Sequence, residues 1–223
     1  MKQDNFVTKT SMIKNELQEA IINGAFKPGE RLIRRTLMKR HDSSLSIVNE
    51  ALGRLENIGL VETKEMHGSR VVLPSNERLV NDLVLREAIE CHVVYLLTTN
   101  IGDDTLKGLL QSATRLDEIL TSSNQSDNKV RLQHLNFHLD MARATGHSIL
   151  VDSLWKVGIR CIVLFNSEYN RSDSINSINS HENLILIIMK RVKEDSFLKI
   201  QDHMHYGLES NWLNSIKNNL DNI

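Results

Sequence analysis

The chain contains little proline, few aromatic residues and no long apolar stretch. Among its 223 residues there are only 2 prolines, and aromatic residues make up 4%, whereas leucine and isoleucine are frequent. The longest apolar run spans residues 184–189, far short of the roughly 20 residues that a membrane-spanning helix needs. The amino terminus lacks the apolar core of a signal peptide. This composition disfavours a β-sandwich and a membrane protein, and we expect a mainly α-helical, cytoplasmic protein.

Cysteines and the common catalytic motifs are also scarce. Cys91 and Cys161 are the only cysteines, and each lies in a stretch with helical apolar periodicity. We therefore expect two buried free thiols rather than a disulfide or a nucleophile. The sequence contains no glycine-rich phosphate loop, no nucleophile elbow and no cysteine–histidine nucleophile pattern. For these reasons we do not expect an enzyme.

Charge is unevenly distributed along the chain. The first 74 residues hold 12 basic and 9 acidic side chains, so their net charge is +3. The remaining residues hold 15 basic and 19 acidic side chains, so their net charge is −4. A chain of this length is long enough for two domains. A basic part followed by an acidic part is typical of a nucleic-acid-binding module joined to a second domain.

Residues 1–74 show the order of elements of a winged helix-turn-helix. Apolar side chains at helical spacing predict three helices, and Gly24, the turn at 27–30 and Gly59 interrupt or end them. Two short strand patterns then flank the glycine-containing tip at 66–68. We expect helices at 8–23, 34–41 and 45–58, and strands at 60–64 and 69–73.

The pattern changes in residues 78–223, where helical periodicity dominates and proline is absent. These features predict a second domain that is an all-α helical bundle. The segment 166–180, which is rich in serine and asparagine, is the expected loop. We expect helices near 78–99, 103–122, 127–145, 147–168, 178–193 and 195–220.

The winged helix-turn-helix offers three groups of side chains to a DNA partner. The first residues of a reading helix reach base edges in the major groove, and Asn49 would suit an adenine edge. Arginines before that helix can contact phosphates, and a glycine-containing hairpin tip can enter the minor groove. A module that binds only protein is the alternative. The expected DNA-binding residues are Ser44, Ser46 and Asn49 for bases, Arg34, Arg35 and Arg40 for phosphates, and His67, Gly68 and Arg70 at the tip.

Residues 21–72 resemble the DNA-binding domain of the GntR family of bacterial transcription regulators. The resemblance rests on residues spread over this segment, among them Gly24, Pro28-Gly29, Arg31-Leu32, Leu37, Ser44, Val48, Glu50-Ala51-Leu52, Arg54-Leu55-Glu56, Gly59-Leu60-Val61, Gly68 and Val71. Arg35 lies where the family often carries a phosphate-contacting arginine, whereas Arg34 replaces a common glutamate. The resemblance implies a winged helix-turn-helix fold and DNA binding.

The reading helix departs from the family's usual sequence. The family pattern is Ser-Arg-x-Pro-Val-Arg-Glu-Ala-Leu, whereas this chain has Leu45 and Asn49 in place of the two arginines. Loss of an arginine–guanine pair costs about 1–3 kcal/mol of discrimination. We therefore expect an operator that differs from those of its relatives and is richer in A·T pairs, which Asn49 would read. Weaker DNA binding is the alternative.

Histidines are concentrated in the expected helical domain. His134 and His138 are four residues apart and therefore share one helix face. His181 and His203 lie on the last two expected helices. Imidazoles from facing helices of a bundle can hold a transition metal. Ordinary surface or core histidines are the more common alternative for such spacing.

Residues from about 78 to 215 resemble the FCD effector domain of the FadR-type branch of the same family. The resemblance rests on Arg86 and Glu90, on Phe137-His138 and on the segment 144–150. In metal-binding members, an aspartate and three histidines hold a divalent metal. The resemblance implies that His134 replaces the aspartate and that His205 is a rival of His203. The implied ligands are His134, His138, His181 and His203.

An all-imidazole site would have its own chemistry. Neutral nitrogen ligands favour Zn²⁺ or Ni²⁺, and also Cu²⁺, over Mg²⁺ or Mn²⁺. They would leave the metal charge uncompensated, so we expect a strong attraction for an anionic effector. Arg86 is the expected partner of the effector carboxylate, because guanidinium binds carboxylates bidentately. An ion pair between Arg86 and Glu90, one helical turn apart, is the alternative.

These observations predict a homodimeric transcription regulator whose DNA affinity responds to a small carboxylate effector. The alternative is a DNA-binding protein whose helical domain only dimerises. A metallohydrolase is disfavoured, because the His-Glu-x-x-His motif needs a glutamate where this chain has Leu135.

Overall fold

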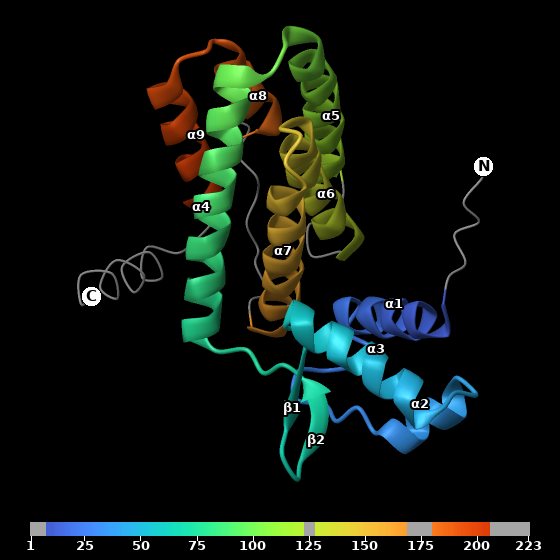
Figure 1. The fold of residues 1–223 in the computed structure, drawn as a ribbon. Helices are drawn as coiled ribbons and strands as arrows, with labels where there is room; N and C mark the ends of the chain where they lie inside the picture. Colours follow the sequence, from blue (N-terminus) through green and yellow to red (C-terminus); the bar gives the residue numbers. More distant parts are fainter. Residues whose placement is uncertain (1–7, 123–127, 169–179, 206–223) are drawn as a thin grey trace, which may run out of the picture. The chain divides into compact units, whose positions relative to one another are not determined.

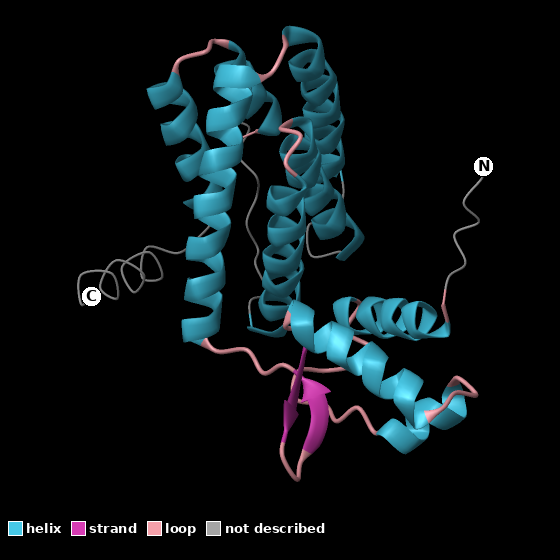
Figure 2. Cartoon of the chain, in the orientation of Figure 1, coloured by secondary structure: helices cyan, strands magenta, loops and turns pink. Residues whose placement is uncertain are grey.

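The computed structural model describes residues 8–122, 128–168 and 180–205 (Figure 1). The chain separates into two compact units, which are described one at a time. The first unit comprises residues 1–76 and 159–169, and the second comprises residues 77–158 and 170–223. Helix dominates the described residues, and a small hairpin supplies the strands (Figure 2). The mainly α-helical fold class expected from the composition is confirmed.

The first unit is a winged helix-turn-helix, as expected. Val61 pairs with Val71 across the antiparallel hairpin, and Lys64 pairs with Gly68 next to the tip. Helix α3 packs against both preceding helices and against the first strand. The elements are α1 (Lys9–Ile22), α2 (Arg34–Arg40), α3 (Leu45–Ile58), β1 (Val61–Lys64) and β2 (Gly68–Val71).

Local signals in the sequence determine where α3 begins and ends. The Ser44 side chain accepts a hydrogen bond from the backbone N–H of Ile47 and so caps the first turn. Gly59 ends the helix in the left-handed conformation, with φ 83°, which side chains with a Cβ rarely adopt. Between these residues, the predicted apolar stripe is fully buried and consists of Val48, Ala51, Leu52 and Leu55.

The second unit is a helical bundle. Helices α4 to α7 run nearly parallel or antiparallel to one another in Figure 1. Helix α8 packs against α5, and α9 packs against α8. The last residues of α7 group with the first unit. The elements are α4 (Asn76–Asn100), α5 (Asp103–Ser122), α6 (Asn128–Ala144), α7 (Ser148–Glu168), α8 (His181–Met189) and α9 (Lys193–His205).

The helix expected at 178–193 is shorter than predicted, because the chain turns after Met189. Arg191 adopts a left-handed conformation there, with φ 64°. Its guanidinium donates to carbonyl groups at the end of α4, which have no partner within their own helix. The accepting residues are Leu97, Thr98 and Ile101. This helix end is held by contacts with residues 90 to 94 positions away in the sequence, so no local pattern predicted it.

The cysteines, the length of the helices and the described ranges bear on the other expectations from the sequence. Both cysteines are free thiols, as predicted, and Cys161 is buried. Cys91, which was also expected to be buried, is only half-buried. None of the helices within the described ranges is both long and apolar enough to cross a membrane. The expected helix 195–220 continues beyond residue 205 into residues outside the described part, as do residues 169–179 of the loop expected at 166–180. Residues 166–168 of that expected loop belong instead to α7.

Candidate functional site

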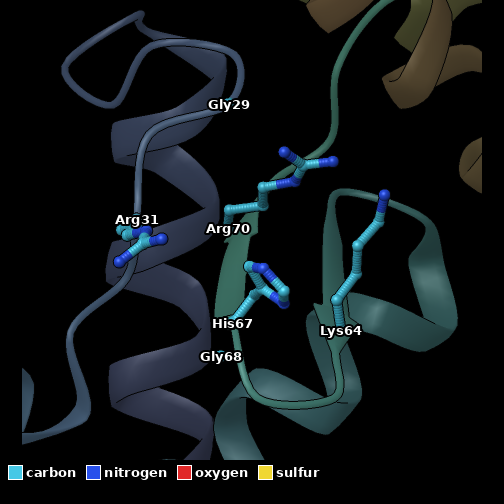
Figure 3. A pocket seen from close by; sticks show the side chains of 6 residues that line it. All are labelled: Gly29, Arg31, Lys64, His67, Gly68 and Arg70. Carbon is cyan, nitrogen blue, oxygen red and sulfur yellow. The ribbon is translucent and has the colours of Figure 1, made fainter.

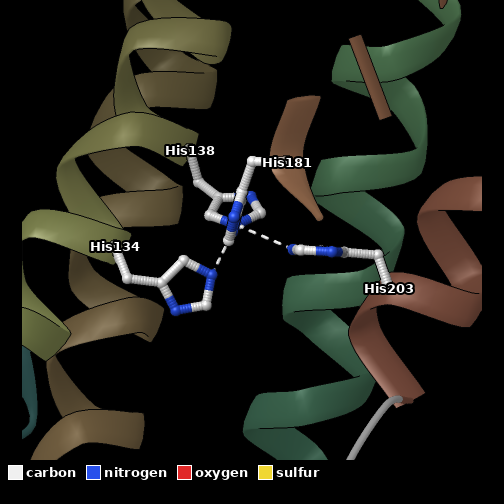
Figure 4. Close-up of side chains that lie close together, drawn as sticks. All are labelled: His134, His138, His181 and His203. Carbon is white, nitrogen blue, oxygen red and sulfur yellow. Dashed lines mark hydrogen bonds between the residues drawn. The ribbon is translucent and has the colours of Figure 1, made fainter. Parts of the chain in front are cut away.

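Four histidines from three helices converge in the second unit (Figure 4). His134 and His138 lie one turn apart on α6, His181 begins α8, and His203 lies on α9. One ring nitrogen of each histidine lies within 4.8 Å of the corresponding nitrogens of the others. The structure therefore brings together all four histidines that the sequence singled out, while the side chain of His205 lies outside the described part.

The spacing of the nitrogens matches that of metal ligands. His138 Nε2 lies 3.0 Å from His134 Nε2 and 3.3 Å from His203 Nε2. Two nitrogens bound to one tetrahedral zinc at 2.0–2.1 Å would be about 3.3 Å apart. The widest separation of 4.8 Å would have to contract by small side-chain rotations. The donor set is thus close to the arrangement that a divalent transition metal requires.

A carboxylate orients His181 from outside the cluster. Asp117 on α5 accepts a hydrogen bond from His181 Nδ1 at 2.7 Å. It also accepts from the backbone N–H groups of His181 at 3.1 Å and Glu182 at 2.9 Å, at the start of α8. The position of Asp117, 64 residues before His181, gave no signal in the sequence. A carboxylate behind a ligating histidine is a common feature of metal sites.

A second carboxylate lies behind His138. Glu90 on α4 is 2% exposed, and its Oε2 lies against Nδ1 of His138. Its Oε1 accepts a hydrogen bond of 2.6 Å from Arg86 Nε. The ion pair that was the alternative for Arg86 is therefore present in the structure. The pairing of Glu90 with a histidine of another helix was not predicted.

Asp117 decides which nitrogen of His181 carries the proton. A carboxylate can only accept, so Nδ1 of His181 must be the donor to Asp117, and in the neutral ring Nε2 keeps a lone pair. Nε2 of His181 is buried, and it has no hydrogen-bond partner among the described residues. A buried polar atom without a partner is unfavourable. A cation among the four rings would remove this cost, so the residues present fit a metal.

The charge states of the cluster also suit a cation. Burial and the neighbouring His181, His138 and His203 hold the pKa of His134 well below its usual value. Burial likewise lowers the pKa of His181, although its hydrogen bond to Asp117 acts in the opposite direction. The rings of His134 and His181 are therefore neutral at pH 7.

The two carboxylates are ionised in spite of their burial. Burial raises the pKa of Glu90, but the charges of Arg86 and His138 outweigh it and bring the pKa below the usual value. Burial also acts to raise the pKa of Asp117, and hydrogen bonds from His181 and Glu182 lower it overall. Neutral imidazoles and ionised carboxylates are the states in which metals bind.

The metal-free protein is expected to lose stability as the pH falls below about 6.5. The pKa values of His134 and His181 are lower in the folded than in the unfolded chain, so only the unfolded chain takes up these protons. The free energy of unfolding should fall by up to about 1.4 kcal/mol per pH unit for each histidine. Urea unfolding between pH 7.5 and 5.5 measures this slope. His134→Gln should reduce it, whereas His67→Gln in the exposed hairpin should not, and a flat profile would contradict the prediction.

The expected base-reading residues lie on the exposed start of α3. Ser46 and Asn49 are exposed, and Leu45 retains 48% of its accessible surface. Ser44 is also exposed, but its oxygen is engaged in capping the helix. Of the expected phosphate-contacting residues, Arg35 is exposed, and Arg40 donates to Glu16 at 2.6 Å.

Arg34 connects the reading helix to the hairpin. Its Nε donates to Asn49 Oδ1 at 2.7 Å, and its Nη2 donates to Ser69 Oγ at 3.0 Å. The sequence suggested a phosphate contact for Arg34 and a base contact for Asn49. The structure joins these two residues, both of which depart from the family pattern.

The tip of the hairpin borders a basic groove (Figure 3). The groove has a volume of about 350 Å³. Gly68 has φ 74° at the turn, and Arg70 forms an ion pair with Glu62. Arg31 and Lys64, which were not among the expected DNA-binding residues, also place positive charge on this groove. The lining residues are Gly29, Arg31, Lys64, His67, Gly68 and Arg70.

The chain is similar to known transcription regulators over most of its length. Residues 9–71 match the family described as bacterial regulatory proteins, gntR family, and residues 83–206 match the FCD domain. The uncharacterized HTH-type transcriptional regulator YdhC of Bacillus subtilis (strain 168) is 22% identical over 198 residues, which is 87% of each chain. The HTH-type transcriptional repressor GlaR of Escherichia coli (strain K12) is 28% identical over 137 residues, 60% of this chain and 62% of GlaR.

A solved structure shows the same fold. E. coli McbR/YncC matches with a TM-score of 0.72 at 20% identity, over 94% of this chain and 99% of the other. The relatives are regulators rather than enzymes, which confirms the expectation that the protein is not an enzyme. The chain is therefore a DNA-binding transcription regulator of the GntR family that carries an FCD domain.

Proposed function

We propose that a small anionic metabolite controls the affinity of this regulator for its operator, and that it binds next to a divalent transition metal in the FCD domain. The observation that carries the proposal is the convergence of four imidazoles, with one buried Nε2 that has no partner among the described residues. The residues proposed to hold the metal are His134, His138, His181 and His203. Because all four ligands are nitrogens, Zn²⁺ and Ni²⁺ fit better than Mg²⁺ or Mn²⁺.

The charges around the cluster support an anionic effector. Glu90 and Asp117 are ionised and Arg86 is cationic, so these three side chains carry a net charge of −1 beside the neutral rings of His134 and His181. A divalent cation would change this charge to +1. The metal is thus partly compensated by two carboxylates, unlike the uncompensated charge expected from the ligands alone. An anion should be repelled by the metal-free site and attracted once the metal is bound.

Arg86 has a different place in the proposal from the one that the sequence suggested. Its Nε–H is used by Glu90, so a contact with an effector carboxylate would involve other N–H groups of the same guanidinium. The pairing keeps Glu90 ionised, and Glu90 in turn orients His138. We propose that Arg86 acts first through Glu90 and only secondarily on the effector.

The proposed response uses two copies of the chain. A homodimer would place two reading helices on the two halves of a palindromic operator. Binding of the anion in the FCD domain would change the spacing of these helices and so the affinity for DNA.

Metal content and ligand-dependent stability test the proposal. Protein purified without a histidine tag is expected to hold about one zinc or nickel ion per chain after incubation with the metal and desalting. Small carboxylates should then raise the melting temperature of metal-loaded protein but not of protein treated with EDTA. A ligand at 100 times its Kd adds roughly 2.7 kcal/mol, which is readily detected. Less than a tenth of an equivalent of metal would refute the site. Metal binding without any response to carboxylates would refute effector control.

A further inference from the structure

Leu45 and Asn49 form one reading face. They are four residues apart on α3, so their side chains lie one above the other on the same side of the helix. Both are exposed, and the exposure of Leu45 reaches 48%. An exposed leucine at the start of a reading helix contributes to the free energy of binding only if the complex buries it against an apolar surface. In the major groove that surface is the C5-methyl group of thymine.

The hydrogen bond from Arg34 fixes which way the amide of Asn49 faces. A guanidinium has only donors, so the Asn49 atom 2.7 Å from Arg34 Nε must be the oxygen. This bond occupies one of the two lone pairs of the oxygen. Bidentate recognition of adenine requires that oxygen as the acceptor as well as an N–H donor. Asn49 held in this way therefore favours a base that offers only an acceptor to its N–H₂ group, and bidentate reading of adenine is the alternative.

Arg34 is itself held by a chain of hydrogen bonds. Its Nη2 donates to Ser69 Oγ at 3.0 Å, and Ser69 is 2% exposed. The Ser69 hydroxyl is then left to donate to Thr63 Oγ1 at 2.9 Å, and Thr63 donates to Glu56 Oε2 at 3.1 Å. This chain runs from a cation on α2 through both strands to an anion on α3. Such a polarised chain strengthens each of its bonds and fixes the guanidinium.

The two side chains together select one base. Thymine presents the acceptor O4 and the C5-methyl group, whereas guanine has acceptors without a methyl group, and cytosine presents a donor. We propose that Leu45 and Asn49 read a thymine in each half-site. Leu45 contacts the C5-methyl group of the thymine, and Asn49 donates a hydrogen bond to its O4. Arg34 is the positioning residue, because it holds the amide of Asn49. The proposal rests on DNA binding by the GntR domain, and it does not depend on the metal or the effector.

Base analogues in a selected operator test the proposal. The full-length protein would first be used to select its site from random duplex DNA. Each thymine would then be replaced by uracil, which lacks only the methyl group. Replacement in one half-site should weaken binding about fourfold, the effect of one buried methyl group. Leu45→Ala should bind both forms equally. The proposal is overturned if uracil is tolerated at every position or if Leu45→Ala still distinguishes the two.

Two further changes test Asn49 and Arg34. Replacing the paired adenine by 7-deazaadenine removes the N7 acceptor, and it should leave the affinity unchanged; a loss would show adenine reading and overturn the proposal. Asn49→Asp keeps the oxygen that Arg34 binds but lacks the N–H donor, so its preference should move from thymine to cytosine. Arg34→Met should allow the reversed A·T pair at that position. An unchanged base preference in either variant overturns the proposed role of that residue. If the protein causes no salt-sensitive mobility shift on any duplex, the whole proposal is overturned.

Discussion

Asp117→Asn is expected to weaken zinc or nickel binding by about 10- to 100-fold. The carboxylate of Asp117 accepts the Nδ1 proton of His181 and keeps Nε2 of this ring unprotonated and aimed into the cluster. The neutral amide would lose the charge that makes the imidazole a stronger ligand. It would also permit the other orientation of the amide, in which the N–H₂ group faces His181. His181→Ala, which removes a ligand, should reduce the affinity further.

The measurement is a metal titration followed by calorimetry or by the shift in melting temperature. Asp104→Asn is the matched control, because Asp104 lies on the same helix with a fully exposed side chain. It should bind the metal as the unchanged protein does. Equal affinities for Asp117→Asn and the unchanged protein would show that Asp117 has no role in the site. A similar loss of metal affinity in both variants would show that the loss comes from a change in helix α5 and not from the hydrogen bond between Asp117 and His181.

Glu90→Gln is expected to destabilise the metal-free protein by about 3–5 kcal/mol. Glu90 is 2% exposed and Arg86 is 16% exposed, so the substitution removes a negative charge that lies against a largely buried guanidinium. The amide would also face Nδ1 of His138 with a weaker acceptor or with its N–H₂ group. Removal of one partner from a buried pair costs more than the pair itself contributes, because the remaining charge stays desolvated.

Urea unfolding in EDTA measures this loss. The chain offers a matched control in Glu50 and Arg54, a pair of the same two residue types at the same spacing on α3. Their side chains are 53% and 46% exposed, so Glu50→Gln should cost only about 0–1 kcal/mol. A double replacement of Arg86 and Glu90 by methionine should recover much of the lost stability. A loss below about 1 kcal/mol for Glu90→Gln would contradict the prediction and would indicate that water reaches Arg86.

The winged helix-turn-helix was predictable because its signals are local. Ser44 and Gly59 mark the ends of the reading helix, and a stripe of apolar residues at helical spacing marks its buried face. The turn at Arg191 was not predictable. An arginine with positive φ is uncommon, and here its guanidinium is engaged by the end of another helix.

The histidine cluster was predicted in part. The spacing of His134 and His138 placed them on one face, and the family resemblance added His181 and His203. The residues behind them were missed, because Asp117 reaches His181 only when α5 and α8 pack together. Helix packing also changes the charge around the cluster, because the ionised carboxylates of Glu90 and Asp117 lie next to histidines that bring no negative charge of their own.

By itself, the sequence determined the fold class, the family and the identity of the four converging histidines. These properties follow from periodicity, capping residues and motifs, which act over a few residues or recur within a family. Only the tertiary structure decided which atoms face which partners. Arg34 binds the oxygen of Asn49, and Asp117 fixes the Nδ1 proton of His181. Hydrogen bonds between distant segments set these orientations, because a donor or acceptor is defined only when its partner is in place.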